Sequence, residues 1–336
     1  MSSSSEDDTA RDLIIDTDTL GINDDALALH YLFALGRVPR LITTVFGNAS
    51  AASSERHAHT LLRAHSLDVD VVRGCEKPLW WHEPVREEVR AAVAALPAGT
   101  YVAALSPDNE HFWGDGDGID VSVGVGTGAG TEDGPAPDVL AVALERSQGA
   151  DVLAIGPVTN IARALRLFGP SGPARHRLWI SGGSLTSGNV TENAEFNAFA
   201  DPEALDACVS AGWESVVMVP LEVLEMPRLV PEVVTRIRRA PTPLGAALDR
   251  LERESPRGES TDREPIWDVV AAAVMADKDL PYKQETGVLS VSTEPPYRGR
   301  VRFRQGDGAH RLVTQVDPEA VVRRFEVAVS RLRTSP

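Results

Sequence analysis

Four carboxylates lie close together near the N-terminus of this chain: Asp16, Asp18, Asp24 and Asp25. The first two end the apolar run 13–15, which is typical of a buried strand. The second two open a helical pattern that Asn23 or Asp24 can cap. Carboxylates so close repel one another unless a cation or a proton lies among them. Oxygen ligands favour a hard ion such as Ca²⁺ or Mg²⁺, whereas a capped helix with solvated acids would need fewer carboxylates.

The net charge of the chain limits the classes of partner that it can bind. The 49 acidic and 33 basic residues give a formal net charge of −16, which repels nucleic acids and anionic membranes. The expected partner is a neutral small molecule, or one bound through a cation. Cys75 and Cys208 have neither a disulfide nor a metal-binding pattern, so we expect free thiols. No signal peptide and no apolar run of about 20 residues is evident, which favours a cytoplasmic protein.

Strand-like and helix-like segments alternate along most of the chain. The strand-like runs are 13–15, 41–46, 69–72, 152–155, 178–180 and 216–219. This alternation predicts an α/β fold with a doubly wound, mostly parallel sheet and flanking helices. Three further strand-like runs in 285–316 predict a β-rich C-terminal annex. We expect a disordered tail (1–11) and one α/β domain (12–333).

Polar residues follow several of the predicted strands. Ligands of such sheets bind beyond the carboxyl ends of the strands, where Asp16, Asp18 and Asn48 would meet. A second polar group follows the strand 178–180 and comprises Asn189, Asn193, Glu195 and Asn197. These residues could simply serve turns, but their place after a strand favours binding.

A glycine-rich segment at 114–130 interrupts the alternation and is typical of a mobile lid or a poorly ordered loop. Its run 124–130 is similar to a dinucleotide-binding fingerprint. Pro135 and Pro137 interrupt the place where the required helix should begin, which argues against NAD.

The order of these motifs resembles the nucleoside hydrolase family, the inosine–uridine-preferring type of N-ribohydrolase. The similarity covers most of 13–279 and includes the Asp cluster together with 44–48, 156–160, 181–183, 195–197, 201–204 and Asp268. It implies an α/β fold, a tightly bound Ca²⁺, and hydrolysis of a ribonucleoside to free base and ribose in purine salvage or nucleoside catabolism. It also implies a homodimer or homotetramer.

The resemblance implies roles for individual residues. Asp18 would be general base and metal ligand, and Asp25 a bidentate calcium ligand. Thr159 would supply a backbone carbonyl to calcium, and Asp268 a further carboxylate. The sugar would be bound by Asp24, Asn48, Asn189, Glu195 and Asn197. Asp16 would orient the loop from behind the ligands.

Physical chemistry agrees with these roles. An N-glycosidic bond breaks through an oxocarbenium-like cation, which acidic surroundings stabilise. Calcium would bind the 2′- and 3′-hydroxyls together with the attacking water and lower the pKa of that water. Asp18 would then accept the proton.

Two features depart from the compact family pattern. Five residues, 19–23, separate the two Asp pairs where that pattern has three, which predicts an altered substrate-facing rim. Trp267 precedes Asp268, where many members carry a histidine that protonates the leaving base. A tryptophan there resembles the purine-preferring branch, in which stacked indoles raise the basicity of the purine so that solvent can protonate it.

Other aromatic residues would complete this arrangement. Trp80 or Trp81 would form the opposite face of the stack. His82 and His111 are alternative proton donors. The simpler interpretations are a core position for Trp267, loop packing for Trp80 and Trp81, and surface positions for the histidines.

Two rival functions remain open at this point. Asp16-Thr17-Asp18 also resembles the opening of haloacid-dehalogenase-type phosphatases, but Leu20 stands where they carry Thr or Val, and no matching lysine is evident. The chain could also be a nucleoside or ribose binder, or a hydrolase of an unusual ribosyl compound. The retained Asp cluster argues against a binder, because binding alone does not need a base beside the metal.

Overall fold

The computed structural model describes residues 11–82, 133–168, 172–254 and 265–331. Within these residues nine strands form one sheet in the order β3-β2-β1-β4-β5-β6-β9-β7-β8. They are β1 (Asp12–Thr17), β2 (Leu41–Thr44), β3 (Asp70–Arg73), β4 (Ala150–Ala154), β5 (Arg177–Ser181), β6 (Ser215–Val219), β7 (Tyr282–Val291), β8 (Val301–Gln305) and β9 (His310–Val316). From β3 to β9 the neighbouring strands are parallel. The predicted doubly wound, mostly parallel sheet is confirmed.

The three C-terminal strands extend this sheet. β9 pairs in parallel with β6, with His310 opposite Val216. β7 then runs antiparallel to both β9 and β8. The predicted β-rich annex is therefore the edge of the main sheet. The division into a tail and one domain stays a prediction, since residues 1–10 lie outside the described residues.

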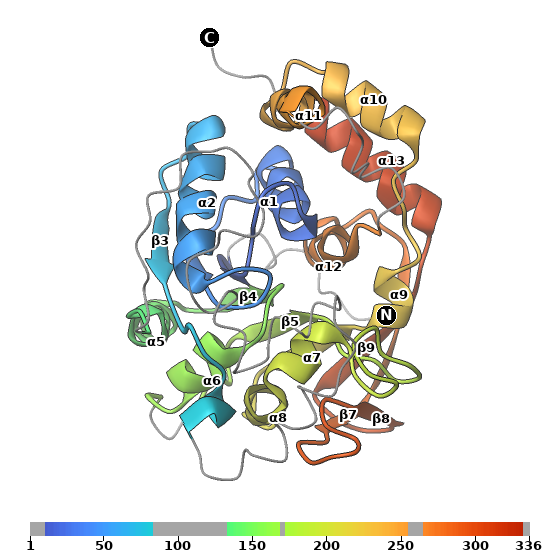
Figure 1. Ribbon diagram of the computed structural model, residues 1–336. Helices are drawn as coiled ribbons and strands as arrows, with labels where there is room; N and C mark the ends of the chain where they lie inside the picture. The colour runs from blue at the N-terminus through green and yellow to red at the C-terminus, as the bar shows by residue number, and fades with distance from the viewer. Residues whose placement is uncertain (1–10, 83–132, 169–171, 255–264, 332–336) are drawn as a thin grey trace.

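Helices cover both faces of the sheet (Figure 1). One face carries α1 (Asp24–Ala34), α2 (Ala51–Ala64), α12 (Trp267–Ala276) and α13 (Pro318–Val329), with α10 (Pro231–Arg239) and α11 (Pro243–Glu254) beside α13. The other carries α5 (Ala136–Arg146), α6 (Thr159–Leu165) and α8 (Pro202–Val209). Short helices η1 (Leu79–His82), α7 (Phe196–Ala200) and α9 (Leu221–Leu224) lie in the connections.

The central strands are apolar on both faces because helices cover both. In β1, Leu13 and Ile15 belong to the cluster under α1 and α12, while Ile14 belongs to the cluster under α5 and α6. This alternation has the period of two that a strand imposes. After the apolar run 13–15, polar side chains resume at Asp16, toward the carboxyl end of β1. The fold therefore places the polar side chains that follow β1 at the carboxyl edge of the sheet.

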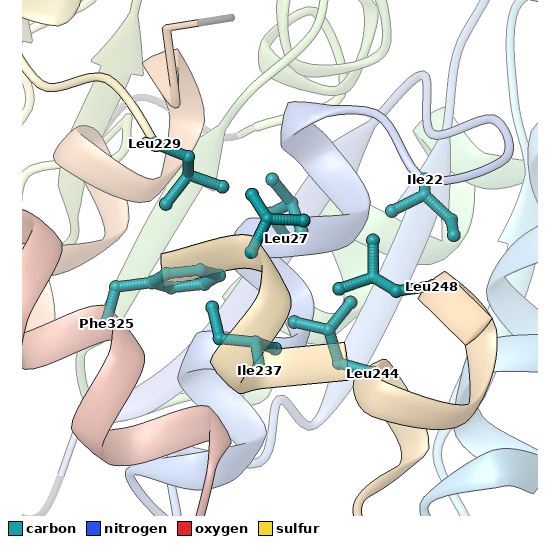
Figure 2. Close-up of a pocket in the computed structure, with 8 residues that line it drawn as sticks. Ile22, Leu27, Leu229, Ile237, Leu244, Leu248 and Phe325 are labelled. Atoms are coloured by element: carbon teal, nitrogen blue, oxygen red, sulfur yellow. The ribbon is translucent and has the colours of Figure 1, made fainter. Parts of the chain in front are cut away.

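A small apolar cavity of about 10 Å³ lies between α1 and the C-terminal helices (Figure 2). Leu27 of α1, Ile237 of α10, Leu244 of α11 and Phe325 of α13 contribute to its walls. A volume of this size is at the lower limit for one water molecule, which would also need polar partners. We infer a packing gap rather than a ligand site.

No helix in the described part of the chain is long and apolar enough to cross a membrane. Cys75 and Cys208 are buried free thiols, as predicted. The glycine-rich segment 114–130 and His111 lie outside the described residues.

Candidate active site

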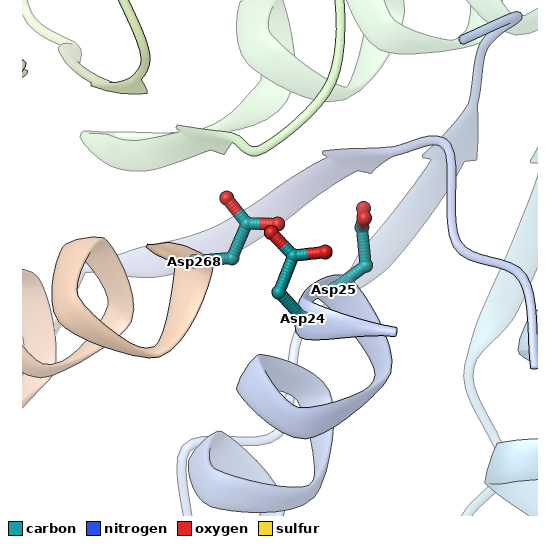
Figure 3. A group of neighbouring side chains, drawn as sticks. All are labelled: Asp24, Asp25 and Asp268. Atoms are coloured by element: carbon teal, nitrogen blue, oxygen red, sulfur yellow. The ribbon is translucent and has the colours of Figure 1, made fainter. Parts of the chain in front are cut away.

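Three carboxylates from two helices meet at the carboxyl edge of the sheet (Figure 3). Asp24 and Asp25 lie in the first turn of α1, and Asp268 lies in the first turn of α12. Carboxylate oxygens of the three residues lie within 4.8 Å of one another. Both helices point the positive ends of their dipoles toward this cluster, which favours negative charge there.

Asn23 fixes the first turn of α1. Its side-chain oxygen accepts a hydrogen bond from the Ala26 amide at 3.1 Å, and its side-chain nitrogen donates to Oδ2 of Asp25 at 2.9 Å. Oδ1 of Asp25 accepts from the Thr17 hydroxyl at 2.5 Å and from the Asp18 amide at 3.2 Å. The carboxylate of Asp25 is therefore oriented by the end of β1 and the loop that follows it.

The carboxylate of Asp18 lies against two glycines, Gly47 and Gly156, whose lack of a side chain leaves room for it. Its Oδ2 accepts a hydrogen bond from the Asn48 amide at 2.5 Å. A Cβ atom at Gly47 would lie 2.0 Å from Oδ2, and one at Gly156 would lie 2.8 Å from Oδ1. Oδ1 is buried and has no hydrogen-bond partner among the described residues. It is available to a metal ion or a proton.

Asp16 lies behind the cluster and is fully buried. Its Oδ1 accepts from the Thr43 hydroxyl at 2.5 Å and from the side-chain amide of Asn160 at 2.8 Å. Asn160 also donates to the Thr44 carbonyl at 2.9 Å and accepts from the Cys75 amide at 2.8 Å. Asn160 thus joins the ends of three strands. Asn160 belongs to the segment 156–160, but its role was not predicted from the sequence.

The cluster carries no compensating positive charge among the described residues. Burial, followed by repulsion from Asp25, raises the pKa of Asp18 well above its ordinary value and that of Asp24 to about 7. Burial raises the pKa of Asp25 to about 6. It also raises that of Asp268, which Asp24 and Asp25 raise further. A divalent cation would relieve this repulsion, and the all-oxygen donor set fits a hard ion.

A cavity of about 220 Å³ opens beside this cluster. Its polar lining residues are Asn23, Asp24, Asn48, Ser181, Asn189, Glu195, Asn197 and Asp268. Its apolar lining residues are Ile22, Leu27, Ile155, Phe196, Leu221, Leu224, Leu229, Pro265 and Ile266, and Trp267 also lines it. The predicted sugar-binding residues are therefore brought together around one cavity next to the acidic cluster.

Glu195 is heavily engaged within the protein. Its Oε1 accepts from the Asn197 amide at 2.9 Å, and its Oε2 accepts from the Gly183 and Ala198 amides at 2.7 and 3.1 Å. Glu195 thereby caps α7 and holds the loop after β5. The side chain of Asn197 donates to the Ser181 carbonyl at 3.3 Å. Any contact of Glu195 with a sugar would come in addition to these bonds.

Thr159 opens α6, and its hydroxyl donates to Oδ2 of Asp201 at 2.7 Å. The same oxygen accepts from the Leu79 amide at 2.7 Å, and Oδ1 caps α8 through Ala204 at 3.1 Å. Burial raises the pKa of Asp201 to about 6. Asp201 fixes Thr159, a role that was not predicted for the segment 201–204.

The structure corrects the prediction for Trp80. Its ring is only 2% exposed, and its indole N–H donates to the Ala200 carbonyl at 2.9 Å. The guanidinium of Arg298 lies over the ring, 5.4 Å from its centroid. Trp80 is a core residue here and does not line the cavity, so it offers no face to a substrate. The side chains of Trp81 and His82 lie outside the described residues.

Trp267 lines the cavity directly beside Asp268, at the start of α12. It is half-buried and packs against the core under α1 and α12. Its indole nitrogen is buried without a hydrogen-bond partner among the described residues. The ring of Trp267 therefore lies at the cavity, and its role in binding a base stays a prediction.

Comparisons with known proteins point to one family. The family model of the inosine-uridine preferring nucleoside hydrolases matches residues 13–323. The chain is 29% identical over 285 residues to the non-specific ribonucleoside hydrolase RihC of Salmonella paratyphi B, which covers 85% of this chain and 84% of the relative. It is 32% identical over 228 residues to RihC of Escherichia coli O1:K1 / APEC, which covers 67% and 66%.

Solved structures agree with this result. The purine-preferring ribonucleoside hydrolase from Gardnerella vaginalis matches with a TM-score of 0.70 and 25% identity over 96% of this chain and 99% of the other. An inosine-guanosine nucleoside hydrolase has the same fold, with a TM-score of 0.71 and 21% identity over 95% and 98%. The chain is a hydrolase of ribonucleoside N-glycosyl bonds and belongs to the nucleoside hydrolase family.

Proposed function

We propose that the chain is a calcium-dependent hydrolase that prefers purine ribonucleosides and releases the free base and ribose. The observation that carries this proposal is the convergence of Asp24, Asp25 and Asp268 within 4.8 Å beside a cavity of about 220 Å³. Buried carboxylates without a basic partner suit a bound divalent ion. Asp18, Asp25, Asp268 and the Thr159 carbonyl would hold calcium. When bound, it would supply positive charge that acidifies the attacking water and binds the sugar hydroxyls.

Asp18 is the proposed general base. Its Oδ2 is held by the Asn48 amide, whereas Oδ1 is buried without a partner among the described residues. A carboxylate with one oxygen held by a hydrogen bond and the other without a partner suits proton transfer. Asp16 would act from behind by keeping the strand end in place, through its hydrogen bonds with Thr43 and Asn160.

The polar lining residues are proposed to hold the ribose. Asp24, Asn48, Asn189, Glu195 and Asn197 offer donors and acceptors on one cavity. Hydrogen bonds to both ribose hydroxyls would discriminate against deoxyribose. Deoxyribose lacks one hydroxyl, so a buried polar group of the protein would be left unpaired. The surrounding carboxylates would stabilise the positive charge that develops on the sugar.

Purine preference is proposed from Trp267. Its ring lines the cavity together with the apolar side chains of Leu221, Leu224 and Ile266. Stacking of a base on an aromatic ring contributes about 1–3 kcal/mol, and a purine offers the larger face. The Gardnerella vaginalis relative is named as purine-preferring, which supports the same proposal.

A non-specific ribonucleoside hydrolase is the second candidate. The apolar lining beside Trp267 could accept either class of base, and the RihC relatives are named as non-specific. A cytoplasmic homodimer or homotetramer is also proposed, on the family resemblance and the acidic, cysteine-poor composition. Light scattering after size exclusion measures the oligomeric state.

The test is release of reducing sugar from inosine, guanosine, adenosine and uridine, with and without a chelator. We expect a higher kcat/KM for the purine nucleosides than for uridine, loss of turnover with chelator, and recovery of turnover when Ca²⁺ is added back. Equal rates for uridine would favour the non-specific candidate. Release from none of the four would contradict the hydrolase proposal for common nucleosides and favour an unusual ribosyl compound.

A further inference from the structure

The carboxylate of Glu222 binds the loop that follows β5. Its Oε1 accepts hydrogen bonds from the Leu185 and Thr186 amides at 2.9 and 2.8 Å. The hydroxyls of Ser184 and Thr186 also donate to Oε1, at 2.9 and 2.8 Å. Partial burial raises the pKa of Glu222, but hydrogen bonds from its own backbone amide, from Thr186 and from Leu185 bring this pKa below its ordinary value. Glu222 is therefore charged at neutral pH and accepts charge-assisted hydrogen bonds.

The two segments that Glu222 joins both line the substrate cavity. The loop and its flanks contribute Ser181, Asn189 and Glu195. The helix α9, in which Glu222 lies, contributes Leu221 and Leu224. Glu222 thus joins the loop after β5, which is proposed to bind the sugar, to the apolar wall that α9 forms.

Other contacts close the loop on itself. Oε2 of Glu195 accepts from the Gly183 amide at 2.7 Å, and the side-chain oxygen of Asn189 accepts from the Phe196 amide at 3.0 Å. One backbone bond, from the Leu221 amide to the Gly183 carbonyl at 2.9 Å, also reaches α9. Among the described residues, the hydrogen bonds from 184–186 to α9 all end on Glu222, so this carboxylate fixes the first part of the loop.

We propose that Glu222 is a positioning residue that sets the affinity for the ribonucleoside by holding the loop 184–189 against α9. This inference rests on the proposed hydrolysis. Glu222 does not belong to the cavity lining. Its loss would therefore displace the groups that bind the substrate without removing a group that acts on the glycosidic bond. KM should change more than kcat.

The chain offers a clean substitution at this site. Oε2 of Glu222 is buried and accepts no hydrogen bond from the described residues. The amide nitrogen of a glutamine can take the place of Oε2, while its oxygen keeps the place of Oε1. Glu222→Gln therefore removes the charge and retains an acceptor. Glu225→Gln is the matched control, because Glu225 is exposed at the end of the same helix.

The experiment compares kcat and KM for inosine in the metal-loaded full chain. Glu222→Gln should raise KM roughly fivefold to tenfold with kcat within about twofold, since charge-assisted hydrogen bonds are about twice as strong as neutral ones. Glu222→Ala should raise KM further, and Glu225→Gln should match the wild type. Circular dichroism checks folding, and the two glutamine variants decide the question even if Glu222→Ala does not fold.

Wild-type KM in Glu222→Gln, or a lower kcat at wild-type KM, would overturn the inference and leave the proposed function standing. A wild type that releases no base from any ribonucleoside would instead refute the proposed function, and this inference with it. The two failures are therefore distinguished before the variants are compared.

Discussion

The backbone amide of Asn48 donates to Oδ2 of Asp18 at 2.5 Å, which ties the chain after β2 to the chain after β1. The other oxygen of Asp18 is buried without a hydrogen-bond partner among the described residues. One oxygen of the carboxylate is thus held by the chain after β2, and the other is left without a hydrogen-bond partner.

Asp18→Asn should abolish turnover in a folded protein. The amide oxygen can still accept from Asn48, but the side chain can no longer take a proton, and loss of a general base costs about 10²–10⁴ in rate. Single-substrate kinetics and circular dichroism measure the two effects. Asp12→Asn, at the opposite end of β1 and paired on the surface with Arg40, is the control. Near-wild-type kcat in Asp18→Asn would remove this residue from the base role.

Gly47→Ala should lower kcat by about a hundredfold, because displacing a reacting group by 1 Å can cost that much. The new Cβ would lie 2.0 Å from Oδ2 of Asp18 and would force the carboxylate to move. Gly149→Ala is the control, since its Cβ would meet no atom closer than 3.3 Å. Unchanged kinetics in Gly47→Ala would show that the position of Asp18 is not critical.

Metal-free protein should lose stability as the pH rises from 6.5 to 8. Burial raises the pKa of Asp24 to about 7 and that of Asp25 to about 6, from 3.8. The folded state therefore holds these protons more tightly than the unfolded state, so its stability falls as they dissociate. Burial lowers the pKa of His30 to about 3 and that of His57, His65 and His176 to about 4. These four side chains act in the opposite direction, chiefly below pH 7.

Thermal unfolding in chelator, with Ca²⁺ added back, measures this effect. The Tm should fall between pH 6.5 and 8 without metal, and Ca²⁺ should restore it by binding the folded state. Asp24→Asn should reduce the fall, because one buried charge is absent. A Tm that rises over this range in chelator would contradict the electrostatic account.

Trp267→Ala should lower kcat/KM for inosine by about fivefold to 150-fold, the equivalent of a stacking contribution of about 1–3 kcal/mol. Trp80→Phe should leave kcat/KM unchanged and lower the Tm, since its indole N–H bonds the Ala200 carbonyl in the core. Equal kinetic losses in both variants would contradict the separate roles of the two tryptophans.

The local motifs were predictable because each lies where a strand gives way to a loop or helix. The apolar run before Asp16 and the capping pattern at Asn23 placed the acidic pair of α1 beside the end of β1, as found. The position of Asn48 followed from the parallel pairing of β1 with β2. Hydrophobic periodicity and helix capping are local signals in the sequence. The parallel sheet then places the residues that they identify at one edge.

Long-range contacts were not predictable from these signals. The burial of Trp80 depends on Ala200 and Arg298, which are distant in the chain. The roles of Asn160, Asp201 and Glu222 arise only when loops from several strands come together. From the sequence alone, an isolated Asn, Asp or Glu beside a helix is interpreted as a helix cap or a solvated residue.

The most direct test of the central claim is base release from inosine by chelator-treated protein as Ca²⁺ is titrated, for the wild type and Asp268→Asn. The account predicts no turnover without metal, a saturable rise with Ca²⁺ in the wild type, and a requirement for far more Ca²⁺ in the variant. Full turnover of the wild type in chelator, or an identical Ca²⁺ dependence in Asp268→Asn, would contradict a metal centre held by Asp18, Asp25 and Asp268.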